Sequence, residues 1–245
     1  MSNYQAWRAL DAVLFDLDGV LTPTVVAHKL AWAALFAAVF TGQWAGVPKY
    51  TEEDYASLVD GRPRYDGVRA VLGSRGLSLP DGTPQDPPDA PTVCGLGNRK
   101  DAIFRAELAK GLSPYPGSLG FLDAVEAAGL KTAVVSGSRN ATAVLDAAGL
   151  AGRFKVVVDG LVAANLGLKG KPSPATFLQA VAELGVQHCK AVVIEDALSG
   201  VEAGVAGRFG LVIGVDRGVG HDALLQHGAD IVVDDLAELI GGGYG

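Results

Sequence analysis

Six short, largely apolar runs recur along this chain, and they restrict its fold more than any other feature. They are Ala12–Phe15, Thr132–Val135, Val156–Val158, Ala191–Ile194, Leu211–Ile213 and Ile231–Val233. A strand with one solvent-facing side alternates between apolar and polar residues, whereas a strand buried on both faces does not. The runs show no such alternation and therefore predict the buried strands of a parallel sheet.

Helical patterns lie between these runs, and a glycine stands where each of several helices should end. The helical patterns cover about 118–128, 141–148, 175–184, 200–206, 221–226 and 236–240, and the glycines are Gly129, Gly149, Gly185 and Gly228. Glycine is the residue that most often ends a helix. Strands that alternate with helices in this way predict an α/β fold with a Rossmann-like, doubly wound parallel sheet.

Residues 23–113 break this alternation. They contain no strand-like run but show a strong helical pattern over Val25–Phe40, and turn-forming residues flank them at Leu21–Thr24 and Leu112–Gly117. Two such crossings are typical of an inserted domain. We therefore expect a core of residues 1–22 and 114–245 and an α-helical cap of residues 23–113. Inside the cap, the proline-rich segment Pro80–Pro91 predicts an exposed loop.

Charge and cysteine content narrow the classes of function. With 20 basic and 27 acidic residues the chain is acidic, which argues against a nucleic-acid groove or an anionic membrane surface. The longest apolar run, Leu30–Phe40, is too short to span a bilayer, and no signal peptide pattern is present. Cys94 and Cys189 lack metal-binding spacing, so we expect no zinc site, no disulfide and a cytoplasmic protein. Nothing in the sequence demands more than a monomer.

Acidic residues directly follow the first apolar run, as Asp16-Leu-Asp18-Gly19. Ligands of open α/β sheets bind at the carboxyl ends of the strands. Two carboxylates at such a place repel each other, which raises the pKa of one unless a cation lies between them. One can then act as a nucleophile while the other, protonated, acts as an acid. The structural alternative is a helix N-cap or a solvated loop.

Three further segments hold polar residues at strand ends or helix starts. Ser136–Asn140 offers hydroxyl and N–H groups to an anion, although Ser and Asn also cap helices for structural reasons. Lys171 in Gly170–Pro174 offers a counter-charge for a phosphoryl group, although most such lysines are surface residues. Glu195 and Asp196 could hold a metal, with capping by Asp196 as the alternative.

The order of these four segments is more specific than any one of them. All fall at the same predicted edge of one sheet, where they supply carboxylates, a hydroxyl and an ammonium group. Mg²⁺ suits an oxygen-rich site that also binds a phosphate. The four segments together predict a Mg²⁺-dependent site for phosphoryl transfer.

In these motifs the chain resembles the haloacid dehalogenase superfamily over essentially its whole length. The resemblance implies a Rossmann-like core with a helical cap inserted after the first motif. It implies that Asp16 accepts the phosphoryl group and that Asp18 is the general acid/base. Phosphate-binding residues would be Ser136, Gly137 and Lys171, and the Mg²⁺ ligands would be Asp16, the main-chain carbonyl of Asp18, Glu195 and Asp196.

Further residues resemble the β-phosphoglucomutase-like subfamily. Arg64, in the segment Val59–Gly67, stands at the position of an arginine that binds the distal phosphate, and Lys100, in Asn98-Arg-Lys100, at that of a lysine facing the sugar. By the same resemblance, the other substrate-binding residues would be Thr24, His28, Trp32, Ser138, Arg139 and Asn140. The alternative for Trp32 is an ordinary core residue.

The resemblance implies a mutase that interconverts β-D-glucose 1-phosphate and glucose 6-phosphate through an aspartyl phosphate and β-glucose 1,6-bisphosphate. A sugar-phosphate phosphatase on the same scaffold is the alternative, and a catalytically silent binding domain is a third. The sequence departs from the subfamily pattern at three places, which bear on the identity of the sugar rather than on the phosphoryl-transfer chemistry. Pro23 replaces the usual hinge aspartate, Arg139 replaces a lysine, and Pro80–Pro91 is an insertion.

Overall fold

The computed structural model describes residues 3–41, 44–59 and 62–241. The chain forms two compact units, of which one comprises Met1–Thr24 and Leu112–Gly245 and the other comprises Val25–Gly111. We refer to them as the core unit and the cap unit and describe each by itself.

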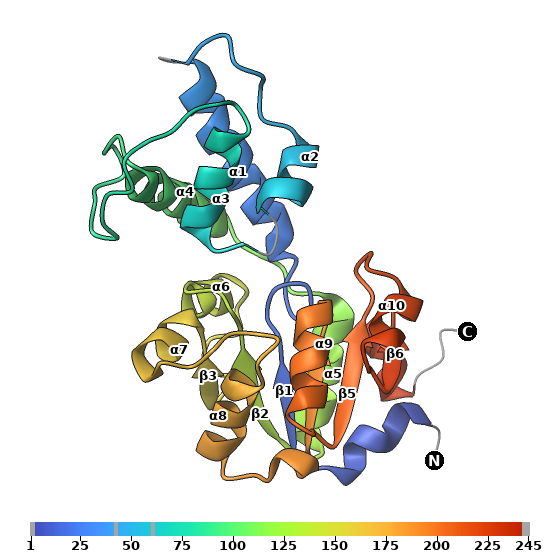
Figure 1. Ribbon diagram of the computed structural model, residues 1–245. Helices are drawn as coiled ribbons and strands as arrows, with labels where there is room; N and C mark the ends of the chain where they lie inside the picture. Colours follow the sequence, from blue (N-terminus) through green and yellow to red (C-terminus); the bar gives the residue numbers. More distant parts are fainter. Residues whose placement is uncertain (1–2, 42–43, 60–61, 242–245) are drawn as a thin grey trace. The chain divides into compact units, whose positions relative to one another are not determined.

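A six-stranded sheet forms the centre of the core unit (Figure 1). Its strands are β1 Ala12–Phe15, β2 Lys131–Val135, β3 Val156–Val158, β4 Ala191–Glu195, β5 Leu211–Val215 and β6 Ile231–Val233. Neighbouring strands of the sheet pair in parallel, and the order is β3-β2-β1-β4-β5-β6. The predicted doubly wound parallel sheet is thus confirmed. The strand order reverses beside β1, where this class of sheet opens a crevice for ligands.

Helices cover both faces of this sheet (Figure 1). They are η1 Asn3–Ala9, α5 Pro116–Ala127, α6 Ala141–Ala147, α7 Gly160–Leu166, α8 Ala175–Leu184, η3 His188–Lys190, α9 Leu198–Ala206, α10 His221–Gln226 and η4 Leu236–Ile240. The sequence patterns predicted α5, α6, α8, α9, α10 and η4 but not η1, η3 or α7. Helix α7 has no fully buried residue and so shows no apolar stripe, and Asp159 starts it by accepting two backbone N–H groups, each at 2.9 Å.

Neighbouring residues of β1 pack into opposite layers, which explains its uninterrupted apolar run. Leu14 belongs to the cluster that contains Phe177 of α8 and Val201 of α9. Phe15 packs edge-to-face against Phe121 of α5, with ring centroids 6.1 Å apart. Since both faces are covered, every residue of β1 is buried.

The two crossings between the units are fastened to each other on the core side. The backbone N–H of Tyr115, in the second crossing, donates to the carbonyl of Leu21 in the first, at 3.0 Å. Three residues further along the chain, the buried hydroxyl of Ser118 donates to the carbonyl of Val20 at 2.6 Å. These bonds fix the chain on either side of the cap unit to the loop that follows β1.

The cap unit is helical over its described residues. Its elements are α1 Thr24–Thr41, whose first residue belongs to the core unit, α2 Glu52–Asp54, the π-helical turn η2 Tyr55–Val59, α3 Arg64–Gly73 and α4 Val93–Leu108. Trp32 and Phe36 of α1, Val68 of α3 and Leu96 of α4 meet in one buried cluster.

Helix α1 is longer than the apolar run within it. The eleven-residue apolar run had led us to expect no segment long enough to span a bilayer. The helix has 18 residues and is, by length and composition alone, long and apolar enough to cross a membrane. This is weak evidence for a span, because the core helices of soluble proteins pass the same test. In this structure the residues Leu35, Phe36 and Val39 of α1 are buried in the cap cluster.

The proline-rich loop is exposed and yet fixed to the cap. Asp86 accepts a hydrogen bond from the hydroxyl of Thr92 at 2.6 Å, and Asn98 of α4 donates its side-chain amide to the carbonyl of Asp86 at 2.8 Å. The predicted loop is confirmed, and these bonds hold it against the start of α4.

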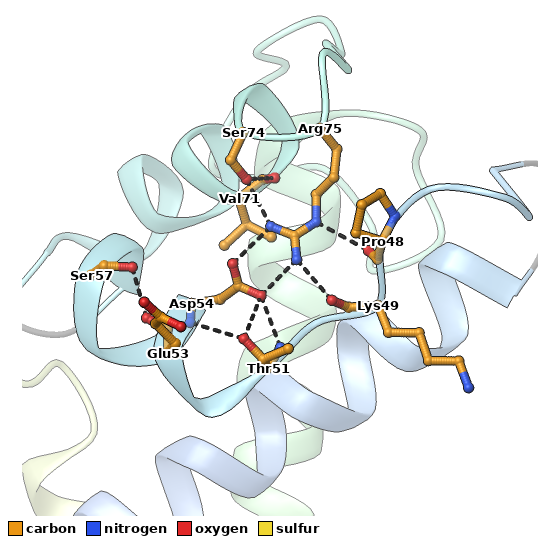
Figure 2. A network of polar contacts seen from close by, with 9 residues as sticks. All are labelled: Pro48, Lys49, Thr51, Glu53, Asp54, Ser57, Val71, Ser74 and Arg75. Carbon is orange, nitrogen blue, oxygen red and sulfur yellow. Dashed lines mark hydrogen bonds and ion pairs between the residues drawn. The ribbon is translucent and has the colours of Figure 1, made fainter.

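A buried guanidinium joins the two ends of the segment between Pro48 and Arg75 (Figure 2). Arg75 follows the end of α3, and its side chain is only 5% exposed. It donates to both carboxylate oxygens of Asp54 and to the carbonyls of Pro48 and Lys49, and its remaining donor bonds Ser74. These contacts use all five N–H donors that arginine carries.

Candidate active site

The loop after β1 carries Asp16 and Asp18, whose carboxyl groups are close enough to interact electrostatically. Asp16 is buried, and its backbone N–H donates to the carbonyl of Ile194 on β4 at 2.9 Å. Asp18 receives a short hydrogen bond from the buried hydroxyl of Thr24 and a longer one, 3.4 Å, from Ser136. Neither aspartate serves as a simple helix cap, so the structural alternative does not account for them.

Lys171 lies between a carboxylate that follows β1 and one at the end of β4. Its ammonium is 2.5 Å from Asp16 Oδ1, forms a close ion pair with Glu195, and donates to the carbonyl of Val135 at 3.2 Å. Its side chain is 15% exposed. Three segments that are distant in sequence thus meet, and Lys171 is not the ordinary surface lysine of the alternative interpretation.

Hydroxyl groups organise the turn after β2. Ser136 is buried, and its hydroxyl accepts the N–H of Ser138 at 3.1 Å while Ser138 accepts that of Asn140 at 3.1 Å. Gly137 between them is exposed, and a Cβ at this position would meet nothing within 4 Å. Ser136 therefore joins the Asp18 cluster, and Ser138 also serves the turn itself.

Glu195 and Asp196 end β4 beside the first loop. Glu195 is the last residue of the strand, so the strand extends one residue beyond the predicted run. Two glycines make room for these carboxylates. A Cβ at Gly19, where φ is +89°, would collide with the Asp196 carboxylate, and a Cβ at Gly200 would collide with Glu195. The N-cap residue of α9 is Ala197, which has no side-chain cap bond, so Asp196 is not the capping residue of that helix.

Burial and like charge shift these carboxyl groups toward their protonated forms. Burial, together with the charge of Asp16, raises the pKa of Asp18 to about 6. Burial also raises the pKa of Asp196 to about 8, with added repulsion from Asp16 and Glu195, and that of Glu195 to about 7. Burial opposes the charge of Lys171, but the attraction of Asp16 and Glu195 outweighs it and its pKa is raised.

The donor set fits a hard cation. One oxygen each of Asp16, Glu195 and Asp196 lie within 4.8 Å of one another. Lys171 supplies one positive charge against these carboxylates and Asp18, so the cluster carries an excess of negative charge when ionised. Clustered carboxylates of this kind are the ligands that Mg²⁺ and similar ions prefer.

A second group of potential ligands lies at the β5 and β6 end of the same unit. Asp216, His221 and Asp234 also bring ligand atoms within 4.8 Å. Here protein donors already satisfy the acids, because Asp216 accepts the N–H groups of Gly218 and Gly220 while His221 bonds Asp234 at 2.8 Å. The buried group around Asp16 differs in that its carboxylates repel one another.

A buried lysine organises the predicted substrate residues of the cap unit. Lys100 of α4 is 4% exposed, and its ammonium lies 2.6 Å from Nδ1 of His28 on α1. The His28 ring stacks on Phe104, with centroids 4.1 Å apart. Burial and the charge of Lys100 lower the pKa of His28 to about 3, so the ring is neutral and accepts at Nδ1.

Trp32 and Thr24 are both engaged in contacts with other side chains. Trp32 is 4% exposed and stacks on Phe36, as the core alternative holds, although Lys100 lies 5.3 Å from its ring centre. Thr24 was expected in the cap but belongs to the core unit, where its hydroxyl is engaged with Asp18. A buried Thr24 hydroxyl thus orients the carboxyl group of Asp18.

The two arginines expected at a distal phosphate lie in different units. Arg64 is the first residue of α3 and forms an ion pair with Asp101 at 2.6 Å. Arg139 is exposed on the turn after β2, beside Gly160, where a Cβ would press on the arginine side chain. Arg64 therefore has a counter-ion that the sequence patterns did not indicate.

Arg217 is a residue of the site that the sequence analysis missed. It follows β5, donates through Nε to the carbonyl of Gly19 at 2.8 Å, and stacks on Tyr115 with its guanidinium carbon 3.9 Å from the ring centre. It thereby braces the loop of Asp18 against the second crossing. The same rule that selected the four segments, polar residues after a buried strand, applies to Asp216 and Arg217 after Leu211–Val215.

Comparisons with known proteins agree with this geometry. A family model described as haloacid dehalogenase-like hydrolase matches residues 10–207. The chain is 48% identical over 240 residues to a protein of Mycobacterium tuberculosis (strain CDC 1551 / Oshkosh) named β-phosphoglucomutase, covering 94% of this chain and 91% of that one. It is 30% identical to the N-acetylmuramic acid 6-phosphate phosphatase of Pseudomonas aeruginosa, over 94% and 93% of the two chains.

Among solved structures, a β-phosphoglucomutase from Clostridium difficile superposes with a TM-score of 0.72. The two sequences are 25% identical, and the match covers 94% of this chain and 93% of the other. The family match, the parallel sheet and the acidic cluster at its carboxyl edge lead to one conclusion. The chain is an enzyme of the haloacid dehalogenase superfamily, in the subfamily that resembles β-phosphoglucomutase.

Proposed function

We propose that the protein is a Mg²⁺-dependent β-phosphoglucomutase that interconverts β-D-glucose 1-phosphate and glucose 6-phosphate. The observation that carries the proposal is the cluster in which Lys171 contacts both Asp16 and Glu195 while Asp18 lies beside them. The 48% identity to the mycobacterial enzyme supports the choice of reaction.

Asp16 is the proposed nucleophile. A carboxylate oxygen of Asp16 attacks phosphorus, an aspartyl phosphate forms, and the bond from phosphorus to the sugar oxygen breaks. In the other half of the cycle the 6-hydroxyl of β-glucose 1-phosphate attacks the aspartyl phosphate, which forms β-glucose 1,6-bisphosphate and restores the carboxylate. Asp16 then takes the C1 phosphoryl group of this bisphosphate, so that glucose 6-phosphate leaves and the aspartyl phosphate is regenerated.

Asp18 is the proposed acid and base. Its proton goes to the departing sugar oxygen, and it later takes the proton of the attacking hydroxyl. A pKa of about 6, raised by burial and by Asp16, makes both protonation states accessible near neutral pH. The hydrogen bonds from Thr24 and Ser136 hold the carboxyl group in place for both steps.

The remaining residues bind charge. Lys171, with Ser136 and the N–H groups around Gly137, would hold the oxygens of the transferring phosphoryl group. Mg²⁺, when bound, neutralises charge on those oxygens, and its proposed ligands are the carboxylates of Asp16, Glu195 and Asp196 with the main-chain carbonyl of Asp18.

The second phosphate and the sugar are assigned to both units. Arg64 and Lys100 with His28 in the cap unit, and Ser138, Arg139 and Asn140 in the core unit, are the proposed contacts. A second anion site allows a bisphosphate to bind in either orientation, which a mutase requires and a simple phosphatase does not. We also propose that the enzyme acts as a monomer in the cytoplasm, where its two free thiols, Cys94 and Cys189, stay reduced.

A sugar-phosphate phosphatase is the second candidate, favoured by the 30% identity to the Pseudomonas phosphatase. In that reaction water rather than a sugar hydroxyl attacks the same aspartyl phosphate. Product analysis separates the two. With β-glucose 1-phosphate, Mg²⁺ and catalytic bisphosphate, the mutase proposal expects glucose 6-phosphate to accumulate. Release of one free phosphate per sugar consumed would instead establish the phosphatase.

A further inference from the structure

Asp101 of α4 connects two arginine side chains in the cap unit. Its Oδ1 lies 2.6 Å from Nη1 of Arg64, and its Oδ2 lies 3.0 Å from Nε of Arg105. The side chains of Arg64 and Asp101 are 24% and 19% exposed, so this pair is more enclosed than an ordinary surface ion pair. The guanidinium of Arg64 is thereby fixed in one direction.

The position of Arg64 is not explained by the stability of its own helix. Arg64 is the first residue of α3, after Pro63, which supplies no side-chain cap. The start of a helix carries partial positive charge, so a cation there is unfavourable. Asp66, the acid of the first turn, bonds Arg69 rather than Arg64. The counter-charge that Arg64 needs comes from α4 instead.

Helix α4 carries two neighbouring residues that fix the proposed substrate-binding side chains of the cap unit. Lys100 and Asp101 are consecutive on it, and they contact His28 of α1 and Arg64 of α3 respectively. The start of α3 packs tightly against α4 here, because a Cβ at Gly97 would collide with the Tyr65 ring. The Tyr65 hydroxyl also donates to Asn98 at 3.0 Å. The Arg64–Asp101 contact is therefore held in a fixed register.

We propose that Asp101 is a positioning residue that holds Arg64 for the distal phosphate of a doubly phosphorylated sugar. This inference rests on the proposed function and names the residue that gives the site its selectivity for such substrates. Free arginine side chains lose considerable rotamer freedom when they bind an anion. A guanidinium already oriented by Asp101 has lost much of it, so binding a phosphate costs less.

The test measures KM and kcat for β-glucose 1,6-bisphosphate in the Mg²⁺-loaded enzyme. Asp101→Ala should raise KM about tenfold, the size expected for loss of a well-aligned bond to a charged group, with a much smaller effect on kcat. Asp101→Asn keeps an oxygen acceptor but not the charge, and should raise KM only about threefold. The intermediate value of the conservative variant would show that orientation is retained in part.

A double-mutant cycle ties the effect to Arg64. In an Arg64→Ala background, neither Asp101 variant should raise KM further, because the group that Asp101 positions is already absent. Arg69→Ala is the matched control, since it removes an arginine of the same helix that pairs with Asp66 and Asp81. It should leave KM within about twofold, as an exposed pair contributes little.

Each other outcome has a definite meaning. A lower KM in Asp101→Ala would show that the carboxylate competes with phosphate, and an equal rise in the Arg64→Ala background would show that it acts elsewhere. Either result overturns the inference alone. If Asp101→Ala does not fold, the threefold rise in Asp101→Asn and its dependence on Arg64 decide the question. A wild-type KM in Arg64→Ala would remove Arg64 from the proposed substrate contacts and overturn this inference alone, whereas free phosphate as the wild-type product would overturn the proposed function and this inference with it.

Discussion

At the scale of single residues, the site depends on an imbalance of charge around Asp16. Lys171 is the cation that contacts Asp16 and Glu195, while Asp18 and Asp196 add further carboxyl groups to the same cluster. Burial raises the pKa of each of the four acids, and repulsion by neighbouring carboxylates adds to the rise for Asp18, Glu195 and Asp196. A folded protein with such groups binds more protons than its unfolded chain does, and this has a measurable consequence.

Metal-free protein should become less stable as pH rises from about 6.5 to about 8, by about 2 kcal/mol. In this range the folded state holds protons on groups such as Asp196, whose pKa is raised to about 8, while the unfolded chain has released them. The free energy of unfolding therefore falls with pH. Mg²⁺ should offset this loss, so the increase in melting temperature on adding Mg²⁺ should be larger at the higher pH.

Two variants check that prediction by thermal unfolding with and without Mg²⁺. Asp196→Asn should flatten the pH dependence and remove most of the Mg²⁺ effect. Glu183→Gln, on the exposed surface of α8, should retain both. A Mg²⁺ stabilisation that is the same at both pH values and survives in Asp196→Asn would show that the ion binds elsewhere.

At the scale of helices and strands, local patterns predicted the fold but not the contacts across it. The run Ala12–Phe15 revealed β1 because burial on both faces leaves a direct trace in the sequence. Helix α7 left none, since it has no fully buried residue. Glu195 was placed after its strand rather than in it, because a charged residue normally ends an apolar run, and only the nearby Lys171 and Gly200 make its burial tolerable.

In the site, too, local patterns identified individual residues but not the contacts between distant segments. Asp16, Asp18 and Lys171 could be found because each follows a strand or opens a helix, and the parallel sheet brings such positions together. The pairing of Lys100 with His28 spans 72 residues, and that of Arg217 with Gly19 spans 198. No local pattern encodes contacts at these separations. They depend on how whole helices pack, which the sequence of one chain does not display.

The five hydrogen bonds donated by the Arg75 guanidinium, called the buried clamp below, give a prediction for the cap unit (Figure 2). Arg75→Lys should lower the local stability of the segment from Pro48 to Ser74 by about 2 kcal/mol, because lysine keeps the charge but cannot make five planar bonds. Hydrogen exchange of the α2 and α3 amides measures this. Arg69→Lys, which alters an exposed pair on the same helix, is the control and should change exchange by less than about 0.5 kcal/mol. Equal changes in the two variants would mean that the buried clamp adds no stability.

At the scale of the whole molecule, two units share the proposed work. The core unit holds the proposed nucleophile, acid and metal ligands, whereas the cap unit holds Arg64, Lys100 and His28. The crossings that join the units are fastened at Tyr115 and Ser118, close to the loop of Asp18. Sequence identity that extends over 94% of the chain includes both units, so the relationship to the mycobacterial enzyme is not confined to the catalytic core.

The central claim is that Asp16 carries the phosphoryl group during turnover. Rapid quenching of the enzyme with β-glucose 1,6-bisphosphate, followed by mass spectrometry of its peptides, tests this directly. One phosphoryl group should be found on the peptide that contains Asp16, and Asp16→Asn should fold with an unchanged circular dichroism spectrum yet neither take up the group nor turn over. Phosphate on another residue, or turnover that persists in Asp16→Asn, would contradict the account.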